Sequence, residues 1–411
     1  MKISVWRITG LAFLGLTALG LQAGCRAQKG PDEELARRIQ NVENALVEFN
    51  PGAPPADPAS QKAWSIQERM AALMIPGVSI AAIDGSKIDW AKSYGIVKAE
   101  SPAPVKTDSL FEAASTTKFI VAAIALRFVE EGRLDLDTDV NSYLKSWQVP
   151  ENEFTKDEKV TLRLLLTHQS GFPMTNMNYD DSDGTPTIVQ VLKGELPAQN
   201  KPAVPEFVPG SKWQYSNVGY VAVQLLLEDV ASQPLAQIAR EVVFEPLGMT
   251  SSTFVYPLSK DLQAKEAIPH DAEGKAGEPA MHPTALAQGG LMTTPSDLAR
   301  FTIELMQAYQ GRSAKILSQE MAKQMFQPAV AMDPQILGPG LSDGLGVFIR
   351  GSGPGFAFLH PGDNYPGSSC WLVGVPDTGQ GAVIMTNGAK GNLLAMEIMA
   401  ALAKEYGWPE G

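Results

Sequence analysis

The stretch Phe111-Glu-Ala-Ala-Ser-Thr-Thr-Lys118 decides how this chain is interpreted. The residues after Ser115 favour a helix, contain no glycine or proline, and run as far as Gly132. Ser115 and Lys118 are three residues apart, so they share one face of that helix. Backbone N–H groups at a helix start can stabilise an oxyanion, and a lysine in a dry pocket can act as a base. One helical turn therefore offers a nucleophile, a base and half of an oxyanion hole.

The pattern is short, and it recurs by chance at Ser142-Tyr-Leu-Lys145. Taken alone, Ser115 is better explained as a helix cap. Two later motifs change this interpretation. Tyr215-Ser-Asn217 is the only Tyr/Ser-x-Asn triplet in the chain, and His360-Pro-Gly362 ends an apolar, strand-like run. Ser-x-x-Lys, Tyr-x-Asn and a late basic-x-Gly, in this order, are typical of penicillin-recognising serine enzymes.

With these motifs the chain resembles the serine β-lactamase-related family, which includes class C β-lactamases, D-alanyl-D-alanine carboxypeptidases and family VIII carboxylesterases. The resemblance covers most of residues 62–406. Further matching segments are Pro76-Gly77, Leu164-Leu-Leu-Thr-His-Gln-Ser-Gly171, Pro209-Gly-Ser-Lys-Trp-Gln-Tyr-Ser-Asn-Val-Gly-Tyr220, Pro246-Leu-Gly-Met249 and Gly289-Gly-Leu-Met-Thr-Thr-Pro-Ser-Asp-Leu-Ala-Arg-Phe301.

The resemblance implies a role for each catalytic position. Ser115 would be the acylated nucleophile, and Lys118 would share the role of base with Tyr215. The phenol pKa of Tyr215 is expected to fall beside a cationic lysine, so that the two groups titrate as a coupled pair. Tyr215 would also return a proton to the leaving group, and Asn217 would hydrogen-bond the substrate amide or acyl chain. The N–H groups of Ser115 and Asp363 would form the oxyanion hole.

His360 is a departure from the family pattern. Penicillin-binding enzymes usually carry Lys-Thr/Ser-Gly where this chain has His360, Pro361 and Gly362, and that lysine grips a substrate carboxylate. Histidine is largely neutral at pH 7, and proline offers neither hydroxyl nor N–H. We therefore expect an acyl-enzyme hydrolase of neutral esters or amides, either esterase-like or peptidase-like. The alternatives are a class C-type β-lactamase, a D-alanyl-D-alanine carboxypeptidase, or a non-catalytic peptidoglycan-binding protein, which the intact nucleophile and base disfavour.

Gly340-Leu-Ser342-Asp-Gly344 fits the nucleophile elbow of a different class, the α/β-hydrolases. That motif needs a strand before the serine and a helix after it. Here a loop rich in glycine and proline precedes the serine and an apolar strand-like run follows, so we predict a turn. His168 is expected to be a structural side chain rather than a triad member.

The amino-acid composition limits the kinds of partner and cofactor that we expect this protein to bind. The formal net charge of −12 over 411 residues disfavours nucleic acid and anionic membrane surfaces. The four histidines, at positions 168, 270, 282 and 360, form no close pair, so no metal site is expected. No cofactor is expected either, and the partner would be a small ester or amide, a peptide, or peptidoglycan.

The pattern along the chain predicts a mixed α/β (α+β) fold of the β-lactamase/transpeptidase type. Its antiparallel sheet would be completed by the two ends of the catalytic domain, 61–411, and flanked by helices. We expect sheet-lobe segments 61–114 and 335–411, with an inserted, mainly helical lobe 115–334. Strand signals lie near 77–84, 88–97, 345–350, 355–360, 369–375 and 381–386, and a helix is expected over about 391–406.

The N-terminus is typical of an exported protein. Basic residues precede an apolar stretch too short for a confident membrane span, which indicates a signal peptide over residues 1–24. Leu21-Gln-Ala-Gly-Cys25 resembles a bacterial lipobox, although Gln22 stands where leucine is usual. Residues 25–60, a charged helix followed by a segment rich in proline and alanine, are expected to be a tether. The expected location is the periplasm or cell envelope of a bacterium.

Mass spectrometry of the mature N-terminus tests this expectation. We predict export and a diacylglyceryl-type anchor on Cys25. Ordinary cleavage after Ala23 or Ala27 would leave an unmodified chain that begins at Gly24 or Gln28. That result would refute the lipid anchor and leave export intact.

Overall fold

A computed structural model describes residues 31–49, 62–178, 184–279, 281–334, 339–353 and 355–409. The expected signal peptide, Cys25 and most of the Pro/Ala-rich linker lie outside the described residues. None of the helices in these ranges is long and apolar enough to span a membrane.

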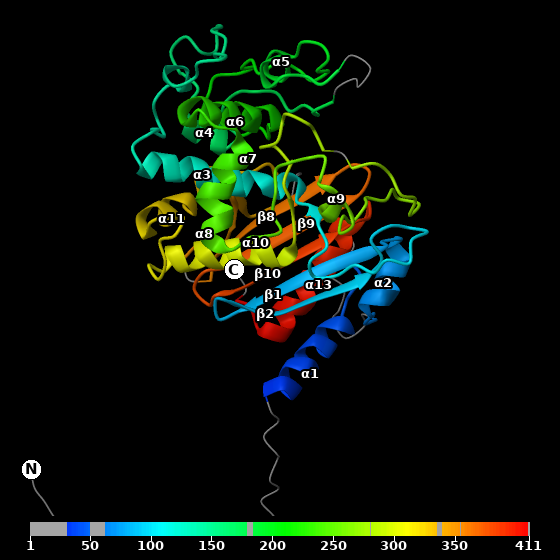
Figure 1. Cartoon of the computed structure of the whole chain (residues 1–411). Helices are drawn as coiled ribbons and strands as arrows, with labels where there is room; N and C mark the ends of the chain where they lie inside the picture. Colours follow the sequence, from blue (N-terminus) through cyan, green and yellow to red (C-terminus); the bar gives the residue numbers. More distant parts are fainter. Residues whose placement is uncertain are drawn as a thin grey trace, which may run out of the picture.

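One antiparallel sheet of eight strands, in the order β2-β1-β10-β9-β8-β7-β6-β5, organises the fold (Figure 1). β1 comes from the start of the catalytic domain and pairs with β10 from its end, with Ile80 opposite Ile384. This pairing confirms the predicted fold class. The strands are β1 Gly77–Asp84, β2 Lys87–Gly95, β5 Val330–Ala331, β6 Leu341–Asp343, β7 Phe348–Arg350, β8 Ala357–Asn364, β9 Ser368–Val375 and β10 Gln380–Thr386.

The two faces of the sheet carry separate cores because side chains alternate along each strand. On β1, Val78 and Ile80 pack in a core shared with α2 (Ile66–Leu73) and α13 (Gly391–Tyr406). Ala81 and Ile83 face the other way, into the large core shared with the inserted helices. The sheet is therefore covered on both faces, and β1 and β10 are buried along most of their length.

Most of the helices lie between β2 and β5, but α10 (Pro295–Tyr309) and β5, which fall inside the helical lobe expected over 115–334, belong with the sheet. α10 packs along β1, β9 and β10, and β5 belongs to the sheet. The sheet-containing layer thus reaches back into the expected helical segment 115–334. The other helices are α3 Thr117–Glu130, α4 Leu162–Leu166, α5 Ile188–Lys193, α6 Asn217–Ala231, α7 Leu235–Ala239, α8 Glu245–Leu247, α9 Lys260–Gln263 and α11 Gln319–Met325.

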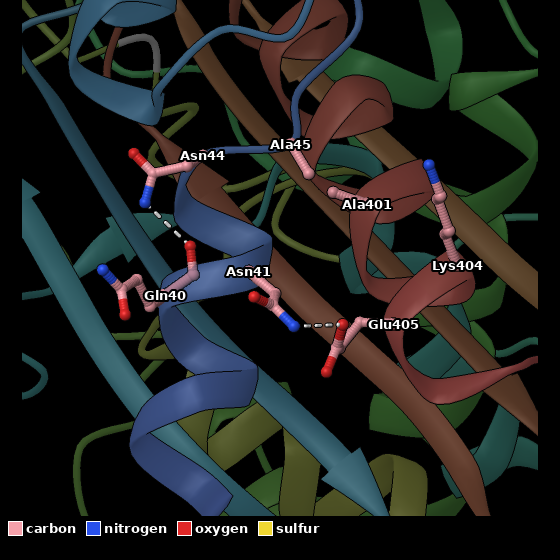
Figure 2. A pocket seen from close by; sticks show the side chains of 7 residues that line it. All are labelled: Gln40, Asn41, Asn44, Ala45, Ala401, Lys404 and Glu405. Carbon is pink, nitrogen blue, oxygen red and sulfur yellow. Dashed lines mark hydrogen bonds between the residues drawn. The ribbon is translucent and has the colours of Figure 1, made fainter. Parts of the chain in front are cut away.

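Residues 31–49, expected as the helical part of a tether, are docked on the folded body. α1 (Pro31–Glu43) lies against α13, and Val42 and Leu46 are fully buried in the core below the sheet. Asn41 donates a hydrogen bond to Glu405 across a polar groove between the two helices (Figure 2). This part of the expected tether therefore belongs to the folded domain.

Candidate active site

Ser115 lies in a short 3-10 turn, Ala114–Thr116, that leads directly into α3. The turn follows β3 (Phe111–Glu112), which pairs with β4 (Met292–Thr293) in a small separate sheet. Ala114 has a φ of +46°, in the left-handed region that side chains other than glycine rarely adopt. Such strain is typically found at functional sites, where the surrounding structure enforces it. Here it lies immediately before the candidate nucleophile.

Lys118 is buried completely beneath Ser115. Its Nζ lies 3.0 Å from Ser115 Oγ and also donates a hydrogen bond to the backbone carbonyl of Gln288. No carboxylate within 4.0 Å pairs with it in the described part of the chain. Burial holds the pKa of Lys118 well below its usual range, because the charged form loses its hydration. A neutral amine beside a serine hydroxyl can accept its proton.

Tyr215 completes the contact from the other side, with its Oη 2.9 Å from Ser115 Oγ. It stands two residues before α6, whose N-terminus is capped by the side chain of Ser216. The expectation of a lowered phenol pKa is wrong. Burial raises the pKa of Tyr215 above its usual range, and the hydrogen bond to Ser115 lowers it by less. The side chain is therefore a phenol that can donate a proton.

His168 holds the segment that carries Tyr215, in line with the structural role expected for it. Its Nδ1 accepts a hydrogen bond of 3.1 Å from the backbone N–H of Ser216, and its ring lies 4.3 Å from that of Tyr215. His168 has a φ of +55°, and burial keeps its pKa well below the usual value. Both contacts orient the segment that carries Tyr215.

The third motif, His360-Pro-Gly362, lies on β8 next to Ser115. β7 pairs with β8 only as far as Leu359, so beyond that residue no described strand covers this edge of β8. The turn containing Ser115 packs here instead, and Thr116 Oγ1 donates a hydrogen bond of 3.1 Å to the His360 carbonyl. A Cβ on Gly362 would lie 2.3 Å from Ala113 O and 2.9 Å from Ser115 N. Only glycine permits this approach.

His360 is buried and stacked on Phe348, with ring centroids 4.8 Å apart. Its Nδ1 lies 2.8 Å from the Pro361 carbonyl oxygen, which can only accept, so Nδ1 carries the hydrogen. Burial, assisted by the nearby Lys118, lowers the pKa of His360 to about 3. The imidazole is therefore neutral over the working pH range, and Nε2 is left as a hydrogen-bond acceptor.

The remaining predicted positions lie around this centre. Asn217 begins α6 and donates a hydrogen bond of 3.4 Å to the Thr175 carbonyl, while its buried Oδ1 has no hydrogen-bond partner in the described residues. Asp363 follows Gly362 on β8, and its carboxylate accepts a hydrogen bond from Ser369 Oγ. The structure thus brings together Ser115 with Lys118 and Tyr215, and sets the end of β8 beside them.

Ser342, the other candidate nucleophile in the sequence, does not lie beside Lys118 and Tyr215. Ser342 lies on β6, two strands away from β8, and pairs with Ile349 of β7. The predicted turn over Gly340–Gly344 is therefore wrong at its centre, because Leu341–Asp343 forms a short strand. A strand at this serine lacks the following helix that a nucleophile elbow requires. Within the described ranges, no group of three or more histidine, cysteine, aspartate or glutamate side chains could hold a metal ion.

Sequence reasoning missed two parts of this site. One is the Gln288 carbonyl, which binds Lys118 from a loop whose backbone position no motif specifies. The other is Asp343, whose carboxyl accepts a hydrogen bond from Trp213 Nε1 at 2.9 Å. The only available signal for the first was the Gly289-Gly290 pair, and a Cβ on Gly290 would lie only 2.9 Å from Leu286 Cα.

A sequence model of the Beta-lactamase family matches residues 65–404. The chain belongs to this family. The match spans all three motifs and both halves of the sheet, in agreement with the geometry around Ser115. Membership supports a serine hydrolase and leaves the substrate open.

Curated relatives of the family match about half of the chain. A putative D-alanyl-D-alanine carboxypeptidase of Escherichia coli strain K12 is 29% identical over 217 residues, which are 50% of this chain and 49% of the relative. Protein flp of Staphylococcus aureus strain N315 is 26% identical over 235 residues, which are 54% of this chain and 44% of that protein. The chain thus spans about half the length of these relatives.

Solved structures match over more of the chain. The octameric penicillin-binding protein homologue from Pyrococcus abyssi superimposes with a TM-score of 0.69 at 26% identity, covering 83% of this chain and 76% of that one. The D-alanine carboxypeptidase AmpC from Burkholderia cenocepacia gives a TM-score of 0.64 at 22% identity, over 82% and 97% of the two chains. The second similarity shows the shared fold alone.

The burial of Lys118 generates a prediction for the pH profile. A lysine base works only when neutral, so kcat/KM should rise as pH increases through the Lys118 pKa and then level off. Because that pKa is lowered, the plateau should be reached well below the pH at which a free lysine loses its proton. Lys118→Arg, which stays charged, should reduce kcat by about 10²- to 10⁴-fold.

Lys145→Arg, in the chance Ser142-x-x-Lys145 motif, is the matched control and should keep full activity. Steady-state kinetics across pH would measure both effects. An active Lys118→Arg enzyme would contradict the assignment of Lys118 as the base.

Proposed function

We propose that this protein is an exported serine hydrolase that cleaves the ester or amide bond of a neutral acyl substrate through an acyl-enzyme on Ser115. The observation that carries the proposal is the position of Ser115 Oγ, 3.0 Å from the buried amine of Lys118 and 2.9 Å from the phenol of Tyr215. A base and an acid on the same hydroxyl are what nucleophilic acyl transfer requires. The leader at residues 1–24 supports export to the periplasm or cell envelope.

In acylation, Lys118 Nζ takes the hydroxyl proton of Ser115 while Oγ forms a bond to the substrate carbonyl carbon. The carbonyl oxygen becomes an oxyanion, which the backbone N–H groups of Ser115 and Asp363 would stabilise. The close packing of Gly362 on the Ser115 backbone supports this pairing of donors. Collapse of the intermediate breaks the bond to the leaving group.

Tyr215 is suited to the second half of the step because its raised pKa keeps the phenol protonated. The phenol donates its proton to the departing alcohol or amine, and the proton held by Lys118 restores the phenol. Water then attacks the acyl-enzyme with the same groups acting in reverse, which releases the acid and regenerates Ser115. The net reaction consumes one ester or amide bond and one water molecule.

The preference for neutral substrates rests on His360. Its ring is neutral, and with Nδ1–H turned toward Pro361 it presents an acceptor rather than a cation. A substrate carboxylate also presents only acceptors, so it gains no hydrogen bond here. A substrate N–H or O–H group would be the complementary partner. Asn217, whose buried Oδ1 has no partner among the described residues, adds a second acceptor close to Tyr215 in sequence.

A D-alanyl-D-alanine carboxypeptidase acting on peptides or peptidoglycan is the second candidate. It is favoured by the similarity to the putative D-alanyl-D-alanine carboxypeptidase of Escherichia coli, which is 29% identical over 50% of this chain. Its substrate ends in a carboxylate, which His360 does not complement. A class C-type β-lactamase meets the same objection.

The nucleophile is tested by replacing each rival serine. We predict that wild type hydrolyses short p-nitrophenyl esters, that Ser115→Ala abolishes turnover, and that Ser342→Ala retains it within about twofold. Release of p-nitrophenol from each purified variant gives the measurement. If Ser342→Ala were the inactive variant, the proposed site would be wrong.

Selectivity is tested by a panel of p-nitrophenyl esters, nitrocefin and D-alanyl-D-alanine peptides. A missing charged hydrogen bond costs about 1.5–3 kcal/mol, so the anionic substrates should be disfavoured roughly ten- to a hundredfold in kcat/KM. His360→Lys should shift the ratio toward nitrocefin. Because the pKa of His360 is about 3, the wild-type ratio should stay constant between about pH 5 and pH 8.

Efficient cephalosporin turnover by the wild type would refute the preference for neutral substrates. Peptide turnover with release of D-alanine would favour the carboxypeptidase candidate instead.

A further inference from the structure

The carboxyl group of Asp343 is a buried acid that the proposed chemistry does not use. Its side chain is completely buried, and no cation within 4.0 Å pairs with it among the described residues. Oδ2 accepts one hydrogen bond, from Trp213 Nε1 at 2.9 Å, and Oδ1 accepts none from any residue that the structure describes. Burying a carboxyl group with so few partners is unfavourable for folding. A residue that destabilises the fold next to the active site calls for a functional explanation.

Asp343 is held firmly by the sheet. It lies on β6 between Val330 of β5 and Phe348 of β7, and its backbone carbonyl accepts a hydrogen bond from Ala329 N–H. Phe348 in turn stacks on His360. The carboxyl group therefore has a fixed position relative to the end of β8, where the candidate oxyanion hole lies.

Trp213 belongs to the other side of the site, two residues before Tyr215 in the segment that leads into α6. The ring of His168 lies 6.0 Å from that of Trp213 and 4.3 Å from that of Tyr215. The backbone of the same segment is tied to His168 at two points, by Gln214 N–H to the His168 carbonyl and by Ser216 N–H to Nδ1. Trp213, His168 and Tyr215 thus form one aromatic group.

The hydrogen bond from Trp213 to Asp343 joins this aromatic group to the sheet. Around it, Trp213 and Tyr215 pack with Met332, Phe348 and Leu359 in a small apolar cluster of their own. The hydrogen bond from Trp213 to Asp343 fixes the indole in one orientation within this cluster. A displaced indole would release the ring of Tyr215, whose Oη must stay 2.9 Å from Ser115 Oγ.

We propose that Asp343 is a positioning residue for Tyr215: it accepts the indole N–H of Trp213 and so holds the phenol against Ser115. The inference rests on the proposed function and adds a part to the same site. The role needs an acceptor oxygen and no negative charge. Burial raises the pKa of Asp343 well above its usual range, which agrees with a neutral acid that accepts through its carbonyl oxygen.

The test compares Asp343→Asn, Asp343→Ala and Trp213→Phe in steady-state kinetics on a p-nitrophenyl ester. Asparagine keeps an acceptor oxygen, so Asp343→Asn should retain kcat within about threefold. Asp343→Ala and Trp213→Phe should each lower kcat about ten- to a hundredfold, because small misplacements of a reacting group have effects of this size. KM should change by less than about threefold, since the group positioned acts in the transition state.

The double variant Asp343→Ala/Trp213→Phe distinguishes the loss of this one contact from a general disturbance of the structure. If both changes break the same contact, the double variant should be no slower than the slower single variant. Tyr406→Phe, which removes the partner of the Trp90 indole on β2 at the other edge of the sheet, is the matched control and should keep wild-type kcat. Thermal melting would confirm that each variant is folded at the assay temperature.

Wild-type kcat in Asp343→Ala, equal losses in Asp343→Asn and Asp343→Ala, or additive losses in the double variant would each overturn the proposal. If Asp343→Ala does not fold, Trp213→Phe decides alone, and wild-type kcat in that variant would overturn the proposal. The proposed function has a separate test: it would be refuted if the Ser115→Ala variant still hydrolysed the ester.

Discussion

The contact between the start of α3 and the open edge of β8 is the constraint on which this site depends. Gly362 allows the strand to approach the backbone of Ser115, and Thr116 ties the helix start to the His360 carbonyl. This contact places the candidate nucleophile at a helix N-terminus beside an edge of β8 that no described strand covers. Both features favour the stabilisation of a developing negative charge. The sheet and the helices on its two faces keep these two elements together.

Burial then sets the electrostatics of the centre. Burial disfavours a positive charge on Lys118, His168 and His360 and lowers the pKa of each, because the charged forms would lose their hydration. Tyr215 stays a phenol for the same reason. The lowered pKa values of these basic groups favour their neutral forms around Ser115. The proposed preference for an uncharged substrate follows from this tendency.

Much of this could be predicted from the sequence because the information was local. The strand at 77–84 and the helix at 391–406 have the observed bounds, since alternation and helical periodicity are properties of neighbouring residues. The three motifs located the candidate site because each specifies residue types at fixed spacing. Their assembly around Ser115 is a property of the tertiary fold, which the family resemblance supplied.

Other features depend on distant partners and could not be read from local patterns. An amphipathic helix at 31–43 does not reveal that α13 is the surface it covers. The short strands β5 and β6 form because their neighbours are strands, although their own sequence, rich in glycine and proline nearby, indicates a turn. The direction of the Tyr215 pKa was mispredicted because it depends on whether Lys118 is charged, and only the degree of burial decides that.

The central claim is that Ser115 carries the acyl group during turnover. Its most direct measurement is peptide mapping by mass spectrometry after the protein reacts briefly with p-nitrophenyl acetate and is quenched in acid. The account predicts one acetyl group, on the peptide that contains Ser115, and no acetyl group on that peptide in Lys118→Arg. Turnover with the acetyl group on Ser342, or on no serine at all, would contradict it.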